Sequence, residues 1–236
     1  GNMDDTTKKS LRDNKDKLVR PKPTGLLGFI SAKEGGYSGA NNSFAWSVMD
    51  NYVSNKYNKP IEALTVGQIK ELQTGSSDTR ELYAVGAYQM IPSVFKEAVK
   101  KLNISDDEVF TPELQDKIAM QHLILGNKRP GLADYLKGNS NNINEAMTSM
   151  AMEWASVPVP KDTRRRKSFD RASTNYNTYI TVPKGDSYYA HEGNRASHNV
   201  TDTKEVLEKA RVATQKDMTN FALAERTRRP NSNQGF

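Results

Sequence analysis

Helix start and stop signals recur along this chain, and they limit its fold more than any other feature. The clearest case, FTPELQDKIAMQHLILG at 110–126, has Thr111 before a first-turn proline and a glycine after its last apolar residue. Threonine caps helix N-termini, proline is tolerated in the first turn, and glycine ends helices. Similar segments begin at Thr65 and near Pro92. The sequence therefore predicts a mainly α fold.

Four further segments carry helical patterns. They are a short apolar helix that ends near Glu34, RPGLADYLKG at 129–138, a longer helix that stops at Pro158, and a last amphipathic helix from near Asp202 to about Arg226. Asp202 and Glu205 have the spacing of a capping box. Residues 159–199 show little periodicity, so the only hairpin we expect is a small one within residues 36–60.

The length and the composition favour one folded domain with looser ends. We assign residues 1–23 to a polar leader or linker, 24–217 to a single helical domain around a cleft, and 218–236 to the end of the last helix and a tail. The mean hydropathy of −0.76 indicates one real core with long polar loops. No run of about 18 apolar residues is present, so we expect no stable membrane insertion, and no signal peptide is visible.

Charge and cysteine content narrow the function further. The chain has no cysteine, which excludes disulfides and thiol catalysis. Its net charge of +6 and isoelectric point near 9.3 favour an anionic partner such as nucleic acid, a membrane surface or the bacterial cell wall. The most basic run, KDTRRRKSFDR at 161–171, is typical of a solvated loop, and a nucleic-acid binder is the least favoured reading.

Metal and nucleotide motifs are missing. The three histidines, His122, His191 and His198, lack the spacing of a zinc-binding motif and offer little for Ser/His/Asp catalysis. The sequence contains no phosphate-binding loop and no dinucleotide fingerprint. We therefore expect neither a metal nor a cofactor.

The carboxylate that best suits catalysis is Glu34, in SAKEGGYSGANN at 31–42. It follows a short apolar helix, where partial burial would raise its pKa and keep it protonated near neutral pH. Such an acid can protonate a glycosidic oxygen, and the two glycines after it leave room for a polymer. Tyr37 and Ser38 supply a flat face and a hydroxyl of the kind that sugars need. The plainer interpretation is a helix-end glutamate before a glycine stop.

A second candidate stretch is AVGAYQM at 84–90, just before a predicted helix. Its small residues suit a tight turn that could bring Tyr88 and Gln89 to the edge of a cleft. The plainer interpretation is an ordinary glycine-containing turn.

Five stretches, taken in order, resemble the lysozyme-like muramidases of the phage lambda endolysin type. They are SAKEGGY at 31–37, VGAYQMIPSVF at 85–95, FTPELQDKIAMQHLI at 110–124, EWASVP at 153–158 and GDSYYAHEGNRAS at 185–197. The resemblance covers about residues 25–216, and the order of the five makes it more specific than any one of them.

This resemblance implies a lysozyme-like α+β fold and an enzyme that cuts the β-1,4 bond between N-acetylmuramic acid and N-acetylglucosamine in peptidoglycan. It makes Glu34 the catalytic acid and places Tyr88 and Gln89 beside the sugar. Ser38 would align with a hydroxyl that assists near the acid, and Tyr188 would serve in glycan contact or in packing.

Two mechanisms fit the resemblance. A hydrolase activates water, commonly with a second carboxylate, for which Asp50 is the nearest acid downstream and Glu81 is another candidate. A lytic transglycosylase, the route of the lambda-type enzymes, needs one carboxyl and yields a 1,6-anhydro product. We favour the one-glutamate route.

The expected partner is the glycan strand of peptidoglycan, with no nucleic acid, and an immunity or inhibitor protein would suit a delivered toxin. The place of action would be the bacterial periplasm or cell wall. The chain has its own linker after Glu34, the basic run and a C-terminal extension, so phage lysis, a tail-associated role and delivery into a rival all stay open. The alternative from another class is a peptidoglycan-binding module that has a lysozyme-like fold and does not cut.

Overall fold

The computed structural model describes residues 4–6, 23–41, 49–167 and 178–228. The chain divides into two compact units, Gly1–Lys128 and Arg129–Phe236. The sequence favoured one domain at 24–217, and those outer boundaries remain a prediction. The predicted leader at 1–23 lies almost wholly outside the described residues.

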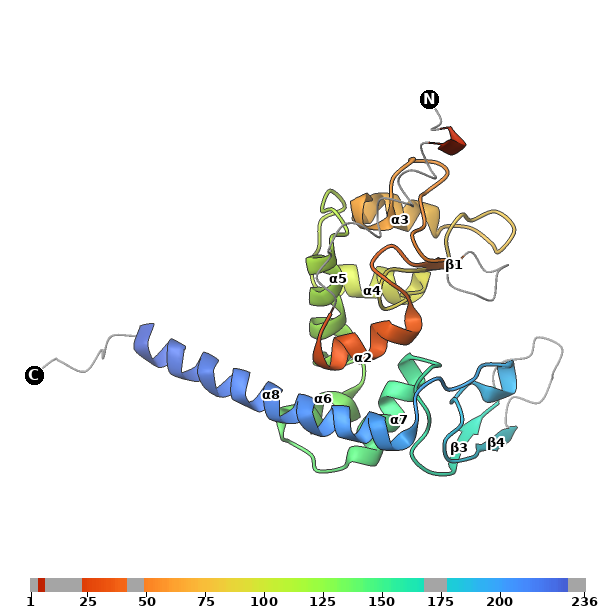
Figure 1. The fold of residues 1–236 in the computed structure, drawn as a ribbon. Helices are drawn as coiled ribbons and strands as arrows, with labels where there is room; N and C mark the ends of the chain where they lie inside the picture. The colour runs from red at the N-terminus through yellow and green to blue at the C-terminus, as the bar shows by residue number, and fades with distance from the viewer. Residues whose placement is uncertain (1–3, 7–22, 42–48, 168–177, 229–236) are drawn as a thin grey trace, which may run out of the picture. The chain divides into compact units, whose positions relative to one another are not determined.

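The first unit is built from short helices and one small sheet (Figure 1). Its elements are α2 (Gly25–Glu34), β1 (Ala40–Asn41), the 3-10 turn η1 (Ile61–Ala63), α3 (Val66–Leu72), β2 (Ala84–Val85), α4 (Pro92–Lys101), α5 (Pro112–Ile118) and the π-helical turn η2 (Ala119–Ile124). Strands β1 and β2 pair antiparallel, with Ala40 opposite Val85. The sheet therefore joins two segments that lie more than forty residues apart in the chain.

The helix signals of this unit work as the sequence predicts. The side chain of Thr65 accepts from the backbone N–H of Gln68 in a capping box, and that of Thr111 accepts from the N–H of Leu114. Helix α4 begins at Pro92. The core of the unit includes Phe95 and Phe110, whose rings meet edge to face with centroids 5.4 Å apart.

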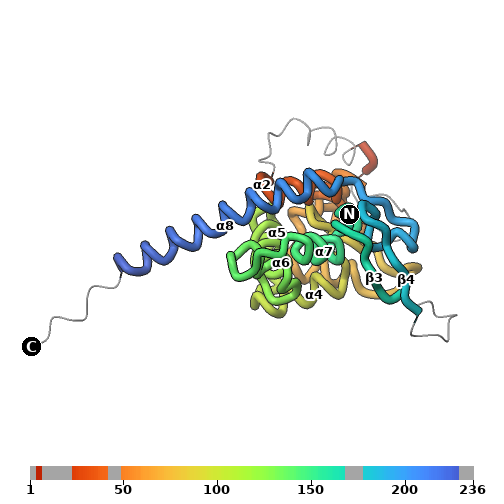
Figure 2. The backbone as a smooth tube through the Cα atoms, turned by 90° about the horizontal axis from the view of Figure 1, so that it is seen from below, coloured from red at the N-terminus to blue at the C-terminus, as the bar shows by residue number. Residues whose placement is uncertain are grey.

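The second unit packs three helices beside a β-hairpin (Figure 2). Its elements are α6 (Pro130–Lys137), α7 (Ile143–Glu153), β3 (Thr163–Arg166), β4 (Tyr179–Val182), the 3-10 turn η3 (Ala190–Glu192) and α8 (Val200–Arg228). Helices α6, α7 and α8 contact one another. Both figures show the C-terminal part of α8 extending beyond α6 and α7.

Several predicted details were wrong. Asp202 does not cap the last helix, because Asn199 does so by accepting from the backbone N–H of Asp202 at 2.8 Å. The helix expected to stop at Pro158 ends at Glu153. The long helix after Thr111 changes to π-helical geometry at Ala119, since its last turn bonds one residue further along.

The region expected to lack regular structure contains the β3–β4 hairpin. Its four cross-strand pairs run from Thr163 opposite Val182 to Arg166 opposite Tyr179. Within the predicted 36–60 hairpin, the described residues form two single antiparallel bridges, Ala40 with Met49 and Val53 with Pro60. A small β component on a mainly α fold is therefore confirmed. Among the described residues, no helix is both long and apolar enough to cross a bilayer.

Candidate active site

Glu34 is the last residue of α2 and is half-buried. Leu26 and Ile30 of the same helix are 5% and 0% exposed. Residues four apart lie on the same helix face, so Glu34 continues the stripe that α2 buries. The Gly35 N–H donates to Ser31 O at 3.1 Å and closes the helix. The carboxyl thus sits at the edge of an apolar face, as the sequence predicts.

The small sheet brings the two predicted motifs together. The Gly86 N–H donates to Gly39 O at 2.8 Å, beside the Ala40–Val85 pair. Val85 and Met90 exchange two backbone hydrogen bonds, which close the 85–90 turn. The loop after Glu34 and the turn that carries Tyr88 and Gln89 are therefore direct neighbours.

The two tyrosines of these motifs share one carboxylate. The Tyr88 hydroxyl donates to Asp116 Oδ1 at 2.6 Å, and the Tyr37 hydroxyl donates to the same carboxylate at 3.0 Å. Burial, followed by the negative charge and hydrogen bond of Asp116, raises the pKa of both hydroxyls above the ordinary tyrosine value. The sequence reasoning missed Asp116, because an acid in the middle of an amphipathic helix carries no local signal of such a role.

Gln115 is fully buried and connects the loop that carries Tyr37 with the turn that carries Tyr88. Its side-chain N–H groups donate to Tyr37 O at 2.9 Å and to Phe110 O at 3.1 Å. Its carbonyl oxygen accepts from the Ala87 N–H at 2.9 Å. Gln115 was also missed by the sequence reasoning, and it completes a support in which neighbouring residues of α5 fix both halves of the site.

Two glycines allow this close packing. Gly86 has φ +80°, and a Cβ there would lie 2.6 Å from the Gln115 side-chain oxygen. A Cβ on Gly39 would lie 3.0 Å from Gly36 O and 3.3 Å from the Gln89 side-chain nitrogen. No larger side chain fits either place without movement.

Gln89 and Ser38 occupy constrained positions beside these glycines. Gln89 has φ +46°, in the left-handed region that only a few per cent of non-glycine residues adopt, and its side chain donates to Gly86 O at 3.0 Å. Such strained residues cluster at functional sites. Ser38 is 4% exposed, and its backbone oxygen accepts from the Tyr52 N–H at 2.9 Å.

Asp50 and Glu81, the two candidates for a second catalytic carboxylate, differ in their surroundings. Glu81 accepts from the Tyr52 hydroxyl at 3.0 Å and from the Asn55 N–H, and Ser54 Oγ approaches its second oxygen at 3.4 Å. The carboxylate of Glu81 therefore holds the 52–55 segment together. Asp50 is exposed.

Tyr188 belongs to the second unit, where it takes part in packing. Its ring lies 4.2 Å from the Arg165 guanidinium carbon and meets the Tyr189 ring edge to face. Its backbone oxygen accepts from Arg165 at 2.6 Å. Its expected contact with the glycan remains a proposal.

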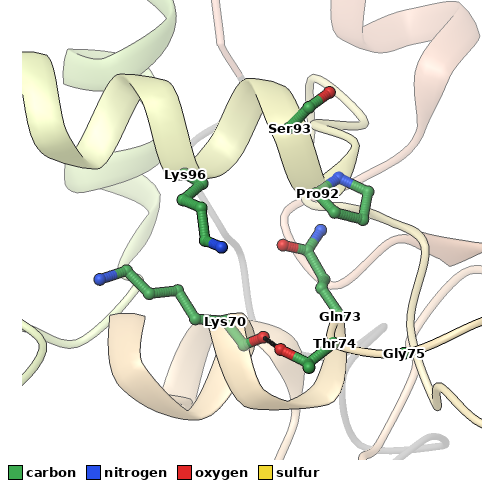
Figure 3. A pocket seen from close by; sticks show the side chains of 7 residues that line it. All are labelled: Lys70, Gln73, Thr74, Gly75, Pro92, Ser93 and Lys96. Atoms are coloured by element: carbon green, nitrogen blue, oxygen red, sulfur yellow. Dashed lines mark hydrogen bonds between the residues drawn. The ribbon is translucent and has the colours of Figure 1, made fainter.

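A pocket of about 370 Å³ lies between α3 and α4 (Figure 3). Its lining consists of Lys70, Gln73, Thr74, Gly75, Pro92, Ser93 and Lys96. None of the predicted site residues lines it. Gln73 links the pocket to the site, because its amide donates to Tyr83 O at 2.6 Å and to Met90 O at 3.0 Å. Gln73, on the wall of this pocket, therefore stabilises the 85–90 turn through its hydrogen bonds to the backbone of Tyr83 and Met90.

The described residues contain no group of three or more His, Asp or Glu side chains that could hold a metal ion. His122 lies in η2 and is buried.

The two tyrosines give the stability of the fold a definite pH dependence. Because the pKa of each hydroxyl is raised on folding, the native state keeps protons that the unfolded chain releases above about pH 10. This stabilisation is complete below pH 10 and is lost as the pH rises further. We expect Tyr37→Phe/Tyr88→Phe to show a smaller fall in the free energy of unfolding between pH 9 and 11, measured by urea denaturation. A fall as steep as that of Tyr83→Phe, the control, would contradict the assignment.

Comparison with known proteins identifies the family of the chain. A family model described as Endolysin matches residues 25–181, which is more than half of the chain. No curated protein and no solved structure matches the chain significantly. The matched range includes Glu34, the loop after it and the 85–90 turn, and the match confirms the endolysin-type resemblance drawn from the sequence. The chain therefore belongs to the endolysin family, which degrades the peptidoglycan of bacterial cell walls.

Proposed function

We propose that this endolysin cuts the β-1,4 bond between N-acetylmuramic acid and N-acetylglucosamine, with Glu34 as its general acid. The observation that supports this most is the position of Glu34. Glu34 is half-buried at the end of α2. The loop that follows it carries Tyr37, and the small sheet pairs this loop with the segment that leads into the Tyr88–Gln89 turn. A general acid must be shielded enough to hold a proton and open enough to meet a substrate, and partial burial at a helix end is compatible with both requirements.

The reaction we propose needs one carboxyl group. Protonated Glu34 donates its proton to the glycosidic oxygen as the bond from that oxygen to C1 of N-acetylmuramic acid breaks. The resulting carboxylate then accepts the proton of the 6-hydroxyl while that oxygen bonds to C1. The products are a free sugar hydroxyl and a 1,6-anhydro end, and Glu34 is protonated again.

The environment of Glu81 supports this route over hydrolysis. Water activation commonly requires a second free carboxylate. The carboxylate oxygens of Glu81 accept hydrogen bonds from Tyr52, Ser54 and Asn55, so the role of Glu81 is to stabilise the loop that contains these residues. Asp50 is exposed and would remain fully solvated.

We assign sugar binding to the loop and turn beside Glu34. Gln89, held by Gly86 in a left-handed turn, presents a half-buried amide. The other three proposed binding residues are mostly buried, so their role is to form the wall of the binding site and hold it in position; they are Tyr37, Ser38 and Tyr88. For Tyr188, which belongs to the second unit, we propose a contact with the glycan.

Mass analysis of digested peptidoglycan distinguishes the two routes. We expect muropeptides with 1,6-anhydro ends, which are lighter by one water than the hydrolytic products. The same digestion by Glu81→Gln should give the same product. Reducing ends in the wild-type digest would contradict the one-glutamate mechanism, and loss of cleavage in folded Glu81→Gln would point to a second catalytic carboxylate.

A further inference from the structure

The β3–β4 hairpin has two chemically different faces. Side chains alternate along a strand, so Arg164 and Arg166 share one face with Tyr179, the partner of Arg166 across the hairpin. The opposite face carries Arg165 and Val182. Burial follows this alternation, since Arg164, Arg166 and Tyr179 are exposed while Val182 is 3% exposed.

The inner face is anchored to the rest of the second unit. Arg165 stacks on Tyr188 and donates to its backbone oxygen at 2.6 Å. The Arg165 guanidinium carbon also lies 5.1 Å from the centre of the Tyr189 ring. These contacts hold the inner face of the hairpin against Tyr188 and Tyr189, so the outer face points away from those residues.

The outer face holds two guanidinium groups ready for an anion. The Arg164 guanidinium lies 4.4 Å from the Tyr179 ring centre, and Arg166 Nε donates to the Tyr179 hydroxyl at 3.2 Å. Among the described residues, neither arginine pairs with a carboxylate. A ring that orders both side chains lowers the entropy lost on binding.

The charge around this face is strongly one-sided. Residues 161–167 contain five basic side chains and one acid, Asp162. Asp162 accepts from the backbone N–H of Lys184 at 2.9 Å, which places a further basic residue beside the hairpin. Among the described residues of the hairpin and Lys184, basic side chains therefore outnumber acidic ones.

We infer that this outer face, formed by Arg164, Arg166 and Tyr179, binds the carboxylates of the peptide stems of peptidoglycan. The planar guanidinium fork matches a carboxylate with two parallel hydrogen bonds. Residues two apart in a strand lie about 7 Å apart, so the two arginines can grip neighbouring carboxylates. The inference rests on peptidoglycan being the substrate, and it does not depend on Glu34 being the acid.

Co-sedimentation with purified insoluble peptidoglycan tests this face. All proteins carry Glu34→Gln, so that the polymer stays intact. We expect Arg164→Gln/Arg166→Gln to weaken binding about tenfold, because two charge-assisted contacts are lost. The matched control, Lys216→Gln/Arg226→Gln on exposed positions of α8, removes the same charge and should bind within about twofold of the parent.

Two further arms test the chemistry of the ligand. Peptidoglycan whose carboxyls have been converted to amides should bind the parent about as weakly as the hairpin variant binds native polymer. Arg164→Lys/Arg166→Lys keeps the charge and loses the fork, so it should bind between the parent and the glutamine variant.

Three results would overturn the inference. They are equal binding by the hairpin and α8 variants, full binding of the parent to amidated polymer, and competition by polyphosphate at far lower concentration than by polyglutamate. If Glu34→Gln still digests the wall, the proposed acid is wrong. The comparison of hairpin and α8 variants can then be made at low temperature and keeps its meaning.

Discussion

Glu34→Gln is expected to lower the rate of peptidoglycan clearing by about 10²- to 10⁴-fold, the usual contribution of a positioned general acid. The amide has nearly the shape of the acid but has no proton to give to a leaving oxygen at neutral pH. Because Glu34 lies at a helix end and is only half-buried, the change should leave the fold intact. Turbidity of a wall suspension measures the rate, and thermal unfolding measures the stability.

The matched control is Glu97→Gln, the same substitution at an exposed position of α4. We expect it to clear the wall at the wild-type rate. Wild-type clearing by Glu34→Gln, with Glu97→Gln unchanged, would remove Glu34 from the mechanism.

Gln115→Ala is expected to lower the free energy of unfolding by about 3 to 5 kcal/mol. It deprives the Ala87 N–H, Tyr37 O and Phe110 O of their buried partner, and each unpaired group costs about 1–3 kcal/mol. Activity should fall as well, since the loop and the turn of the site lose their common support. Urea denaturation measures the stability.

Gln121→Ala makes the same chemical change at an exposed position six residues later. Its free energy of unfolding should stay within about 0.5 kcal/mol of wild type. A Gln115→Ala protein as stable as this control would mean that the hydrogen bonds beneath the site contribute little.

The sequence was most informative where local signals decide the structure. Thr65, Thr111 and Pro92 mark helix starts, and Gly35 follows a helix end, because capping and proline geometry depend on near neighbours. The position of Glu34 at the end of a partly buried helix follows from the same signals. These elements could be predicted residue by residue.

The parts that were missed depend on distant contacts. Asp116 meets Tyr37 across 79 residues, and no local pattern announces such a pair. The β3 strand consists of a threonine and three arginines, a sequence that is typical of a loop. It forms a strand because Arg165 stacks on tyrosines of the same unit and Arg164 and Arg166 stack on Tyr179 across the hairpin.

Release of soluble muropeptides tests most directly whether this protein cuts peptidoglycan through Glu34. Wild type and Glu34→Gln are incubated with purified insoluble peptidoglycan, and bound protein and released fragments are measured in the same samples. We expect equal binding, abundant release by wild type and at least a hundredfold less release by Glu34→Gln. Binding without release by wild type, or equal release by both proteins, would contradict the account.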